Sequence, residues 1–196
     1  MINFLLKISA FIGIVLLSPI IFISMALIVI EDGLPFFFIQ ERLGKNQKIF
    51  KIYKIRTMFN STPNLGTHEV SVSNYLKIGS FLRSLKIDEL PQIINYIKGD
   101  LNLIGPRPGL PSQNDLKIAR IKNNIFDITP GITGLSQVLG YDMSNPNLLS
   151  EIDAIYLKKK SLKIDILIFL ATFYKPLRKR LVAIFKTDIE EGLQNV

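Results

Sequence analysis

The sequence predicts a mostly helical α+β fold: a re-entrant membrane helix at the N-terminus, a β-hairpin, and amphipathic interfacial helices around a small core. Three observations indicate it: an uncharged apolar run near the N-terminus, two β-rich runs separated by a polar turn, and apolar stretches interleaved with basic residues near the C-terminus. A chain of 196 residues accommodates one domain with a real core. We expect residues 1–33 to form the membrane segment, 34–186 the main domain and 187–196 a polar, loosely held tail.

The membrane segment is the run from Ile8 to Ile30, which has 23 residues and no charge. As a helix it is about 34 Å long, which is enough to cross the apolar layer of a bilayer. A secretory signal peptide has a shorter apolar region, and here only Lys7 precedes the run. The run therefore predicts a helix that stays in the membrane.

A proline in the middle of this run predicts a kink. Pro19 removes one backbone hydrogen bond and clashes with the carbonyl four residues earlier, while Ser18 can satisfy local backbone groups. A straight span would place Lys7 and the rest of the chain on opposite faces of the membrane. A helix that bends at Ser18-Pro19 and returns leaves both on the cytoplasmic face, as the positive-inside rule prefers. We favour re-entry, and a straight span is the alternative.

The later part of the sequence carries the whole positive excess of the chain. Nine lysines and arginines and one acid lie between Lys158 and Lys186, a net charge of +8 that equals that of the entire chain. Apolar runs interleave with these cations, which is typical of helices on an anionic membrane surface. A solvated basic face is the simpler alternative. We do not expect a nucleic-acid partner, because no base-reading motif is visible.

The two β-rich runs, FFFIQER and KIFKIYKIRTM, predict a β-hairpin with Gly44 in its turn. The second strand would present Lys51, Lys54 and Arg56 near the membrane face, although solvation of a surface strand explains these cations equally well. Residues 74–86 follow as a predicted helix.

The residue types present exclude several kinds of site. The sequence has no cysteine, which excludes disulfides, thiolate nucleophiles and cysteine-based zinc sites. His68 is the only histidine, so a Ser-His-Asp triad would have to form around it. Gly and Ser residues punctuate its surroundings, and we interpret His68 as a surface loop residue.

Asp88 and Glu89 stand side by side where a helix should begin. Apolar residues recur after them at helical spacing, and Gly99 ends the pattern. We expect Asp88 at or near the N-cap and Glu89 in the first turn, where the helix dipole keeps carboxylates ionised. A good helix cap is the simple interpretation. Because one acid suffices for a cap, the second favours a metal ligand or a nucleophile.

Other stretches offer groups for binding phosphate. Pro106 and Pro108 stiffen the backbone on both sides of Arg107, so its guanidinium can hold a phosphate in a fixed geometry. An arginine in a rigid turn is the alternative interpretation. Arg83, five residues before Asp88, is a second candidate. Residues 129–138, TPGITGLSQV, contain glycines that would let backbone N–H groups approach a ligand closely.

Taken together, these stretches resemble the monotopic phosphoglycosyl transferases, the bacterial sugar transferase family that begins glycoconjugate assembly on a polyprenol carrier. The resemblance covers nearly the whole chain, in the family's order and near-family spacing. The motifs that carry it are the apolar segment broken at Ser18-Pro19, KIYKIRTM, RSLKIDELPQIINYIKGDLNLIGPRP, PGITGLSQV, and Asp153 and Asp165 on either side of YLKKKSLKI.

The resemblance implies a reaction and a place for it. Asp88 matches the family's nucleophile, which attacks the sugar-bearing phosphate of a UDP-sugar, releases UMP and holds the phospho-sugar covalently. Polyprenyl (undecaprenyl) phosphate then accepts the phospho-sugar. Glu89 matches the family's ligand for Mg²⁺. Residues 34–186 would be the catalytic domain, on the cytosolic face of the bacterial inner membrane.

The resemblance also implies substrate contacts. Arg107, between Pro106 and Pro108, matches a nucleotide- or phosphate-contacting position, and Arg83, Arg56 and Gln137 are weaker assignments.

One departure concerns the loop that holds Gln137. Many relatives follow Gln-Val with Asn-Gly-Arg, whereas this chain has Leu139, Gly140 and Tyr141, so the arginine is missing. The identity of the sugar and a homo-oligomeric state are left open. A non-catalytic membrane-anchored scaffold and a polyanion-binding subunit are the alternative functions.

Overall fold

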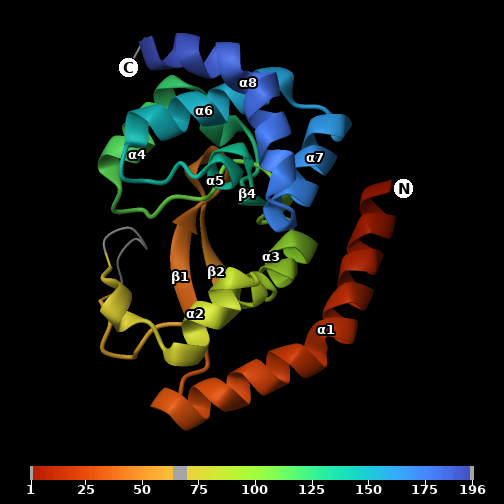
Figure 1. The fold of residues 1–196 in the computed structure, drawn as a ribbon, viewed down its shortest axis with the longest axis vertical. Helices are drawn as coiled ribbons and strands as arrows, with labels where there is room; N and C mark the ends of the chain where they lie inside the picture. Colours follow the sequence, from red (N-terminus) through yellow and green to blue (C-terminus); the bar gives the residue numbers. More distant parts are fainter. Residues whose placement is uncertain (1, 64–69, 195–196) are drawn as a thin grey trace. The chain divides into compact units, whose positions relative to one another are not determined.

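The computed structural model describes residues 2–63 and 70–194 (Figure 1). His68 lies outside the described residues, so its predicted loop position stays a prediction. The chain forms two compact units, one of Met1–Glu41 with Lys51–Asp100 and the other of Arg42–Phe50 with Leu101–Val196. Both contain helices and short strands, which confirms the predicted mostly helical α+β class.

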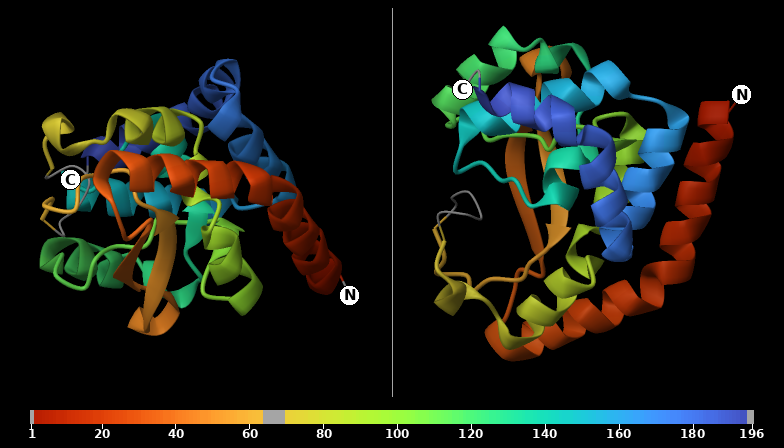
Figure 2. Two further views of the ribbon diagram at one scale, coloured as in Figure 1. Left: turned by 90° about the horizontal axis from the view of Figure 1, so that it is seen from below. Right: turned by 45° about the horizontal axis from the view of Figure 1, so that its top comes forward.

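Helix α1, Ile2–Asp32, is the predicted membrane segment. Within the part of the chain that the structure describes, its stretch Leu6–Asp32 is the one long and apolar enough to cross a membrane. Figures 1 and 2 show a helix with a pronounced bend. Pro19 lies inside it, and Ser18 Oγ donates to the Val15 carbonyl at 2.7 Å. The bend follows from the lost backbone bond at proline, as the sequence predicts.

The β-hairpin is present. Strands β1, Phe37–Leu43, and β2, Ile49–Ile55, form a two-stranded sheet joined by the short 3₁₀ turn η1, Lys45–Gln47. Gly44 begins the turn, but the left-handed conformations belong to Asn46 and Gln47, with φ of 53° and 59°.

The first unit also contains the helices that follow the hairpin. These are the 3₁₀ turn η3, Val72–Asn74, helix α2, Lys77–Ser84, the 3₁₀ turn η4, Ile87–Glu89, and helix α3, Gln92–Lys98. Helices α2 and α3 contact α1. The buried residues that hold the unit together come from α1, β2 and α2, and they are Ile21, Ile28, Ile55, Leu76 and Leu82.

Polar contacts hold both ends of α1 against this unit. Near its start, Lys7 Nζ donates to the Ile97 carbonyl in the last turn of α3 at 2.8 Å. Near its end, the Glu31 carboxylate accepts from the backbone N–H groups of Lys77, at 2.7 Å, and Ile78, at 3.2 Å. These are orphan donors of the first turn of α2, so Glu31 acts as a helix cap supplied by another element.

The second unit contains a two-stranded parallel sheet and five helices among its described residues. The strands are β3, Asn102–Ile104, and β4, Gly131–Thr133, paired with Asn102 opposite Gly131. The helices are α4, Asn114–Lys122, α5, Leu135–Leu139, α6, Pro146–Lys159, α7, Leu162–Phe173, and α8, Pro176–Gln194, with the 3₁₀ turn η5, Ile125–Asp127, after α4.

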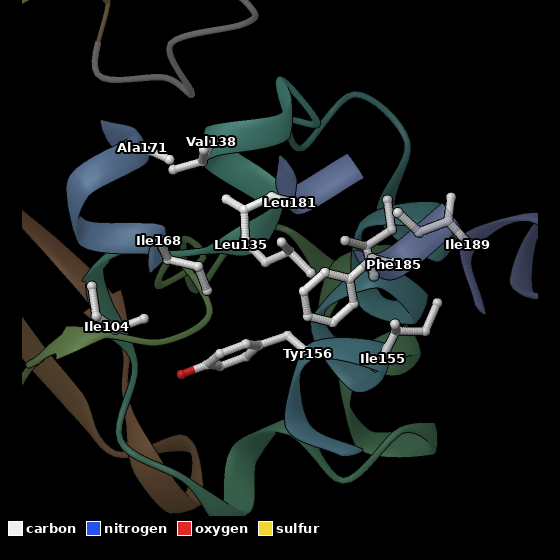
Figure 3. Packing of buried hydrophobic residues seen from close by; sticks show 11 residues of the cluster. Ile104, Leu135, Val138, Ile155, Tyr156, Ile168, Ala171, Leu181, Phe185 and Ile189 are labelled. Atoms are coloured by element: carbon white, nitrogen blue, oxygen red, sulfur yellow. The ribbon is translucent and has the colours of Figure 1, made fainter. Parts of the chain in front are cut away.

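The core of this unit is a cluster of apolar side chains between the helices. Figure 3 shows Leu135 and Phe185 in the middle of this cluster, with Tyr156 below them and further side chains from β3, α5, α6, α7 and α8. Ile189 belongs to the cluster, so residues 187–194, which we expect to form a loose tail, instead continue α8.

Candidate active site

The acid pair lies in the first unit, in the turn before α3. Asp88 and Glu89 belong to η4, whereas α3 begins at Gln92 with Pro91 at its N-cap and no capping side chain. The prediction that Asp88 caps this helix is therefore wrong. Lys86, in the left-handed region at φ 61°, turns the chain so that residues 87–89 form a separate turn. Proline then starts the helix, because its fixed φ suits the first turn.

Asp88 is a buried carboxylate among cations. Its exposure is 4%, and no side chain of residues 2–63 and 70–194 donates a hydrogen bond to it. Burial raises the pKa of Asp88, an effect opposed by the positive charges of Lys54, Arg83 and Lys86. The expected helix-dipole stabilisation of the ionised form is thus outweighed by desolvation. A poorly solvated carboxylate in a positive field has the properties of a nucleophile for a phosphate ester.

Glu89 is held by two lysines. Lys54 Nζ lies 3.2 Å from its Oε1, and Lys86 Nζ lies 3.9 Å from its Oε2. No group of three or more His, Cys, Asp or Glu converges among the described residues. Mg²⁺ at phosphate sites needs fewer protein ligands, because one or two carboxylates suffice when substrate phosphates and water complete its shell. The acid pair fits that donor set.

Lys54 is a site residue that the sequence analysis does not identify as one. We expect it near the membrane face with Lys51 and Arg56, yet it points toward the acid pair. Side chains alternate along a strand, and Lys54 shares its face with Ile52, which is 3% exposed, whereas Lys51 is exposed. Ile55, on the opposite face, is 1% exposed as well, so alternation along the strand does not by itself single out Lys54 in the sequence.

Strand β2 is fixed against α3 through one buried amide. Asn95 on α3 donates Nδ2 to the Lys51 carbonyl at 2.8 Å and accepts from the Tyr53 backbone N–H at 3.2 Å. Its exposure is 0%, so breaking these bonds would leave polar groups buried without partners. This contact sets the register between Lys54 and the turn that carries the acid pair.

Two other predicted cations of this unit have different surroundings. Arg83 lies over the Tyr75 ring, 5.0 Å from its centroid, and Nη1 donates to Thr57 Oγ1 at 3.4 Å. It is close enough to lower the pKa of Asp88, so the structure brings it to the acid pair. Arg56 is instead buried in an ion pair with Asp32 at the end of α1. Arg56 is therefore not on the open surface of the strand, and its expected place near the membrane face stays a prediction.

The phosphate-binding candidate Arg107 lies in the second unit. Pro106 and Pro108 are buried on either side of it, and Arg107 itself is half-buried. Arg42, at the end of β1, donates Nη1 to the Pro108 carbonyl at 3.1 Å. Burial, together with the positive charges of Arg107 and Arg120, lowers the pKa of Arg42 to about 9. Arg42 is absent from the sequence prediction, because its contact joins residues 66 positions apart.

The glycines of residues 129–138 serve packing. The N–H of Gly131 donates to the Pro106 carbonyl at 2.9 Å, and that of Gly105 to the Thr133 carbonyl at 2.9 Å. A Cβ on Gly131 would lie 2.1 Å from the Gly105 nitrogen. The N–H of Gly131 is therefore used within the protein and does not face a ligand, whereas for the rest of this loop the expectation stays a prediction. Gln137 donates to the Ile132 carbonyl at 3.4 Å, and its buried Oε1 has no partner among the described residues.

A model of the bacterial sugar transferase family matches residues 2–179 of the chain. The chain belongs to this family. It is 36% identical to the UDP-N-acetylgalactosamine-undecaprenyl-phosphate N-acetylgalactosaminephosphotransferase of Aeromonas hydrophila over 171 residues, which are 84% of this chain and 40% of that protein. It is 32% identical to the UDP-glucose:undecaprenyl-phosphate glucose-1-phosphate transferase of Caulobacter vibrioides over 168 residues, 80% of this chain and 62% of that protein.

A relative of similar size is the uncharacterized sugar transferase EpsL of Bacillus subtilis. It is 36% identical over 160 residues, which are 82% of this chain and 79% of that protein. The chain therefore covers most of one relative and less than two thirds of the length of the other two.

Asp153 and Asp165, the two acids named for the resemblance outside the acid pair, both make internal contacts of the second unit. Asp153 is 2% exposed, accepts from Arg120 Nη2 at 2.8 Å and from Ser136 Oγ at 2.8 Å, and burial raises its pKa. Asp165 accepts from Tyr156 Oη at 2.6 Å. Both acids hold helices of the unit together.

Helices α7 and α8 and the short junction between them expose apolar side chains among basic residues. The largest exposures are those of Leu162, Phe173 and Tyr174, at 76%, 65% and 61%. Large exposed apolar patches bordered by cations are typical of contact with an anionic lipid surface.

Proposed function

We propose that this sugar transferase moves a phospho-sugar from a UDP-sugar to polyprenyl phosphate, giving polyprenyl-diphosphate-sugar and UMP, as the first membrane step of glycoconjugate synthesis. The observation that carries the proposal is Asp88: a buried carboxylate, beside a second acid, in the field of three cations. The names of the Aeromonas and Caulobacter relatives support the classes of donor and acceptor.

In the first step, an ionised oxygen of Asp88 attacks the β-phosphorus of the donor. The bond between this phosphorus and the oxygen that bridges to the α-phosphate breaks, and UMP leaves with the bonding electron pair. The product on the protein is an acyl phosphate that carries the sugar. Lys54 and Arg83 place positive charge at the turn, which favours an anionic transition state.

In the second step, a phosphate oxygen of polyprenyl phosphate attacks the same phosphorus. The acyl–phosphate bond breaks, and its electron pair returns to Asp88 as a carboxylate. The cations that favour ionisation of Asp88 make it a better leaving group, so one arrangement of charges serves both steps.

Glu89 would hold Mg²⁺ next to the donor. A bound Mg²⁺ supplies neutralisation of the charge on the donor diphosphate. In the structure Glu89 is paired with Lys54 and Lys86, so binding the cation requires Glu89 to exchange at least one of these contacts.

A re-entrant α1 supports a site on one face of the membrane. Lys7 near the start of α1 contacts α3, and Glu31 near its end caps α2. A helix that crossed the bilayer would put these two contacts on opposite faces. We therefore place both ends of α1 and the acid pair on the cytosolic face of the bacterial inner membrane, with α7 and α8 on the anionic leaflet. There the nucleotide donor and the acceptor phosphate meet.

The test is an intact-mass measurement of the protein after incubation with Mg²⁺ and candidate UDP-sugars, without acceptor. We expect a mass increment equal to the phospho-sugar, release of UMP, and discharge of the increment on addition of polyprenyl phosphate. Asp88→Asn should show none of these while it remains folded. An increment that persists in Asp88→Asn would refute the assignment of the nucleophile.

A further inference from the structure

The Pro106–Gly109 loop is held in place by the end of β1. Arg42 Nη1 donates to the Pro108 carbonyl at 3.1 Å, and the next residue, Leu43, donates its backbone N–H to the Gly109 carbonyl at 2.9 Å. The two consecutive contacts fix the backbone on the C-terminal side of Arg107. Pro106 and Pro108 limit the torsion angles of the same stretch, so the loop has little freedom to reorient.

Three guanidinium groups gather at this loop. Besides Arg42 and Arg107, Arg120 is near, because its Nη1 lies 3.7 Å from the position that a Cβ on Gly109 would take. The charge of Arg120 is matched by Asp153 at 2.8 Å. Burial lowers the pKa of Arg42, and the positive charges of Arg107 and Arg120 lower that pKa further. Neighbouring cations disfavour each other, and an anion that binds beside them relieves that repulsion.

We propose that Arg42 is a positioning residue for anion binding at Arg107. It fixes the Pro106–Gly109 loop so that the half-buried Arg107 guanidinium meets a phosphate of the nucleotide in one orientation. Arg42 is 6% exposed, so it acts through the loop rather than by touching the ligand. The inference rests on the proposed function and extends it to a residue that holds the nucleotide-binding group.

Arginine suits this position better than lysine because of the geometry of its donor groups. A planar guanidinium donates to the Pro108 carbonyl in a fixed direction, whereas an ammonium on a flexible stem is a point charge. Arg42→Lys therefore keeps the charge and loses the fixed geometry. Arg42→Met removes both, with a side chain that still fills the apolar space.

The test uses UMP as the probe and the full chain in detergent or nanodiscs. Binding of UMP is measured by calorimetry for the wild type, Arg42→Met, Arg42→Lys, Arg107→Met and the double variant. We expect Arg42→Met to weaken UMP binding about tenfold or more, as for the loss of a hydrogen bond from a charged group, with Arg42→Lys in between. Lys48→Met removes one exposed charge from the same hairpin and should leave binding within twofold.

The double variant separates positioning from general damage. If Arg42 acts through Arg107, Arg42→Met adds little once Arg107 is gone, whereas independent effects would multiply. Steady-state kinetics should agree: Arg42→Met raises KM for the UDP-sugar far more than it lowers kcat. If Arg42→Met does not fold, the same comparison with Arg42→Lys decides.

Two outcomes overturn the inference while the wild type binds UMP and forms the covalent adduct. One is UMP binding by Arg42→Met within twofold of the wild type, and the other is multiplicative loss in the double variant. A wild-type protein that neither binds UMP nor forms an adduct with any UDP-sugar instead refutes the proposed function itself.

Discussion

Replacing Asp153 by asparagine will strongly destabilise the second unit. Asp153 and Arg120 are each 2% exposed, and Arg120 Nη2 lies 2.8 Å from Asp153 Oδ2. Asparagine keeps the size of the side chain and can still accept from Ser136, so the substitution removes one charge and leaves Arg120 buried opposite a neutral group. Breaking a buried ion pair from one side costs about 3–5 kcal/mol of the free energy of unfolding.

The assay is thermal unfolding followed by circular dichroism at fixed detergent concentration. The expected loss corresponds to a fall in Tm of about 6–20 °C for a chain of this size. The matched control is Lys186→Met, which breaks an ion pair with Glu190 at 3.9 Å whose side chains are 68% and 61% exposed. An exposed pair is worth about 0–1 kcal/mol, so the control should melt close to the wild type.

The double variant Arg120→Met with Asp153→Asn tests the cause. Once the buried guanidinium is gone, no uncompensated charge remains, so the double variant should be more stable than the sum of the single losses predicts. If Asp153→Asn unfolds within about 1 kcal/mol of the wild type, or if the two losses add, the ion pair does not carry the stability that its burial implies.

Three further predictions concern the first unit. Asp88→Asn should have a higher Tm than the wild type at neutral pH without Mg²⁺, because burial raises the pKa of Asp88 in the folded protein and so favours a neutral side chain there. The difference in Tm should narrow as pH falls, because the wild-type carboxyl then takes up its proton. A difference that widens toward low pH would contradict this sign. Lys54→Met removes the positive charge that lowers the pKa of Asp88 most. In a plot of the rate of adduct formation against pH, the rise on the acid side should therefore move to higher pH. A rise that stays at the same pH would show that Lys54 does not act on the nucleophile. A cysteine introduced at Lys7 in the cysteine-free chain should react with a membrane-impermeant maleimide from the cytosolic side, as should one introduced at Lys77, whereas labelling of the first from the opposite side would establish a straight span.

Local patterns in the sequence predicted the parts of the fold that local physics decides. The uncharged run with its proline predicted a bent apolar helix, and α1 has both properties. The two β-rich runs predicted the hairpin. Gly99 predicted the end of a helix, and α3 ends there with the glycine at φ 89°. In each case the deciding interaction joins residues a few positions apart.

The structural features that the sequence did not predict depend on contacts between residues far apart in the chain. The pairing of Arg56 with Asp32 and of Arg42 with Pro108 depends on tertiary packing, and no local pattern records it. The sequence predicts that another group packs closely against the backbone at Gly131, and this is so, but that group is the backbone of Gly105 and not a ligand. The sequence predicts an Asp88 carboxylate that stays ionised, whereas burial raises its pKa, because the burial of a side chain depends on the packing of the whole unit.

The two polar contacts that hold the ends of α1 have a consequence for the kinds of membrane in which this protein can work. A helix that crosses a bilayer must match its hydrophobic thickness, or the helix tilts and the lipid deforms. If α1 enters and leaves the membrane on one face, as we propose, a bent helix whose two ends are fastened by Lys7 and Glu31 reaches a depth set by its own bend. Its insertion is then insensitive to the far leaflet, and thin and thick bilayers should host it equally well.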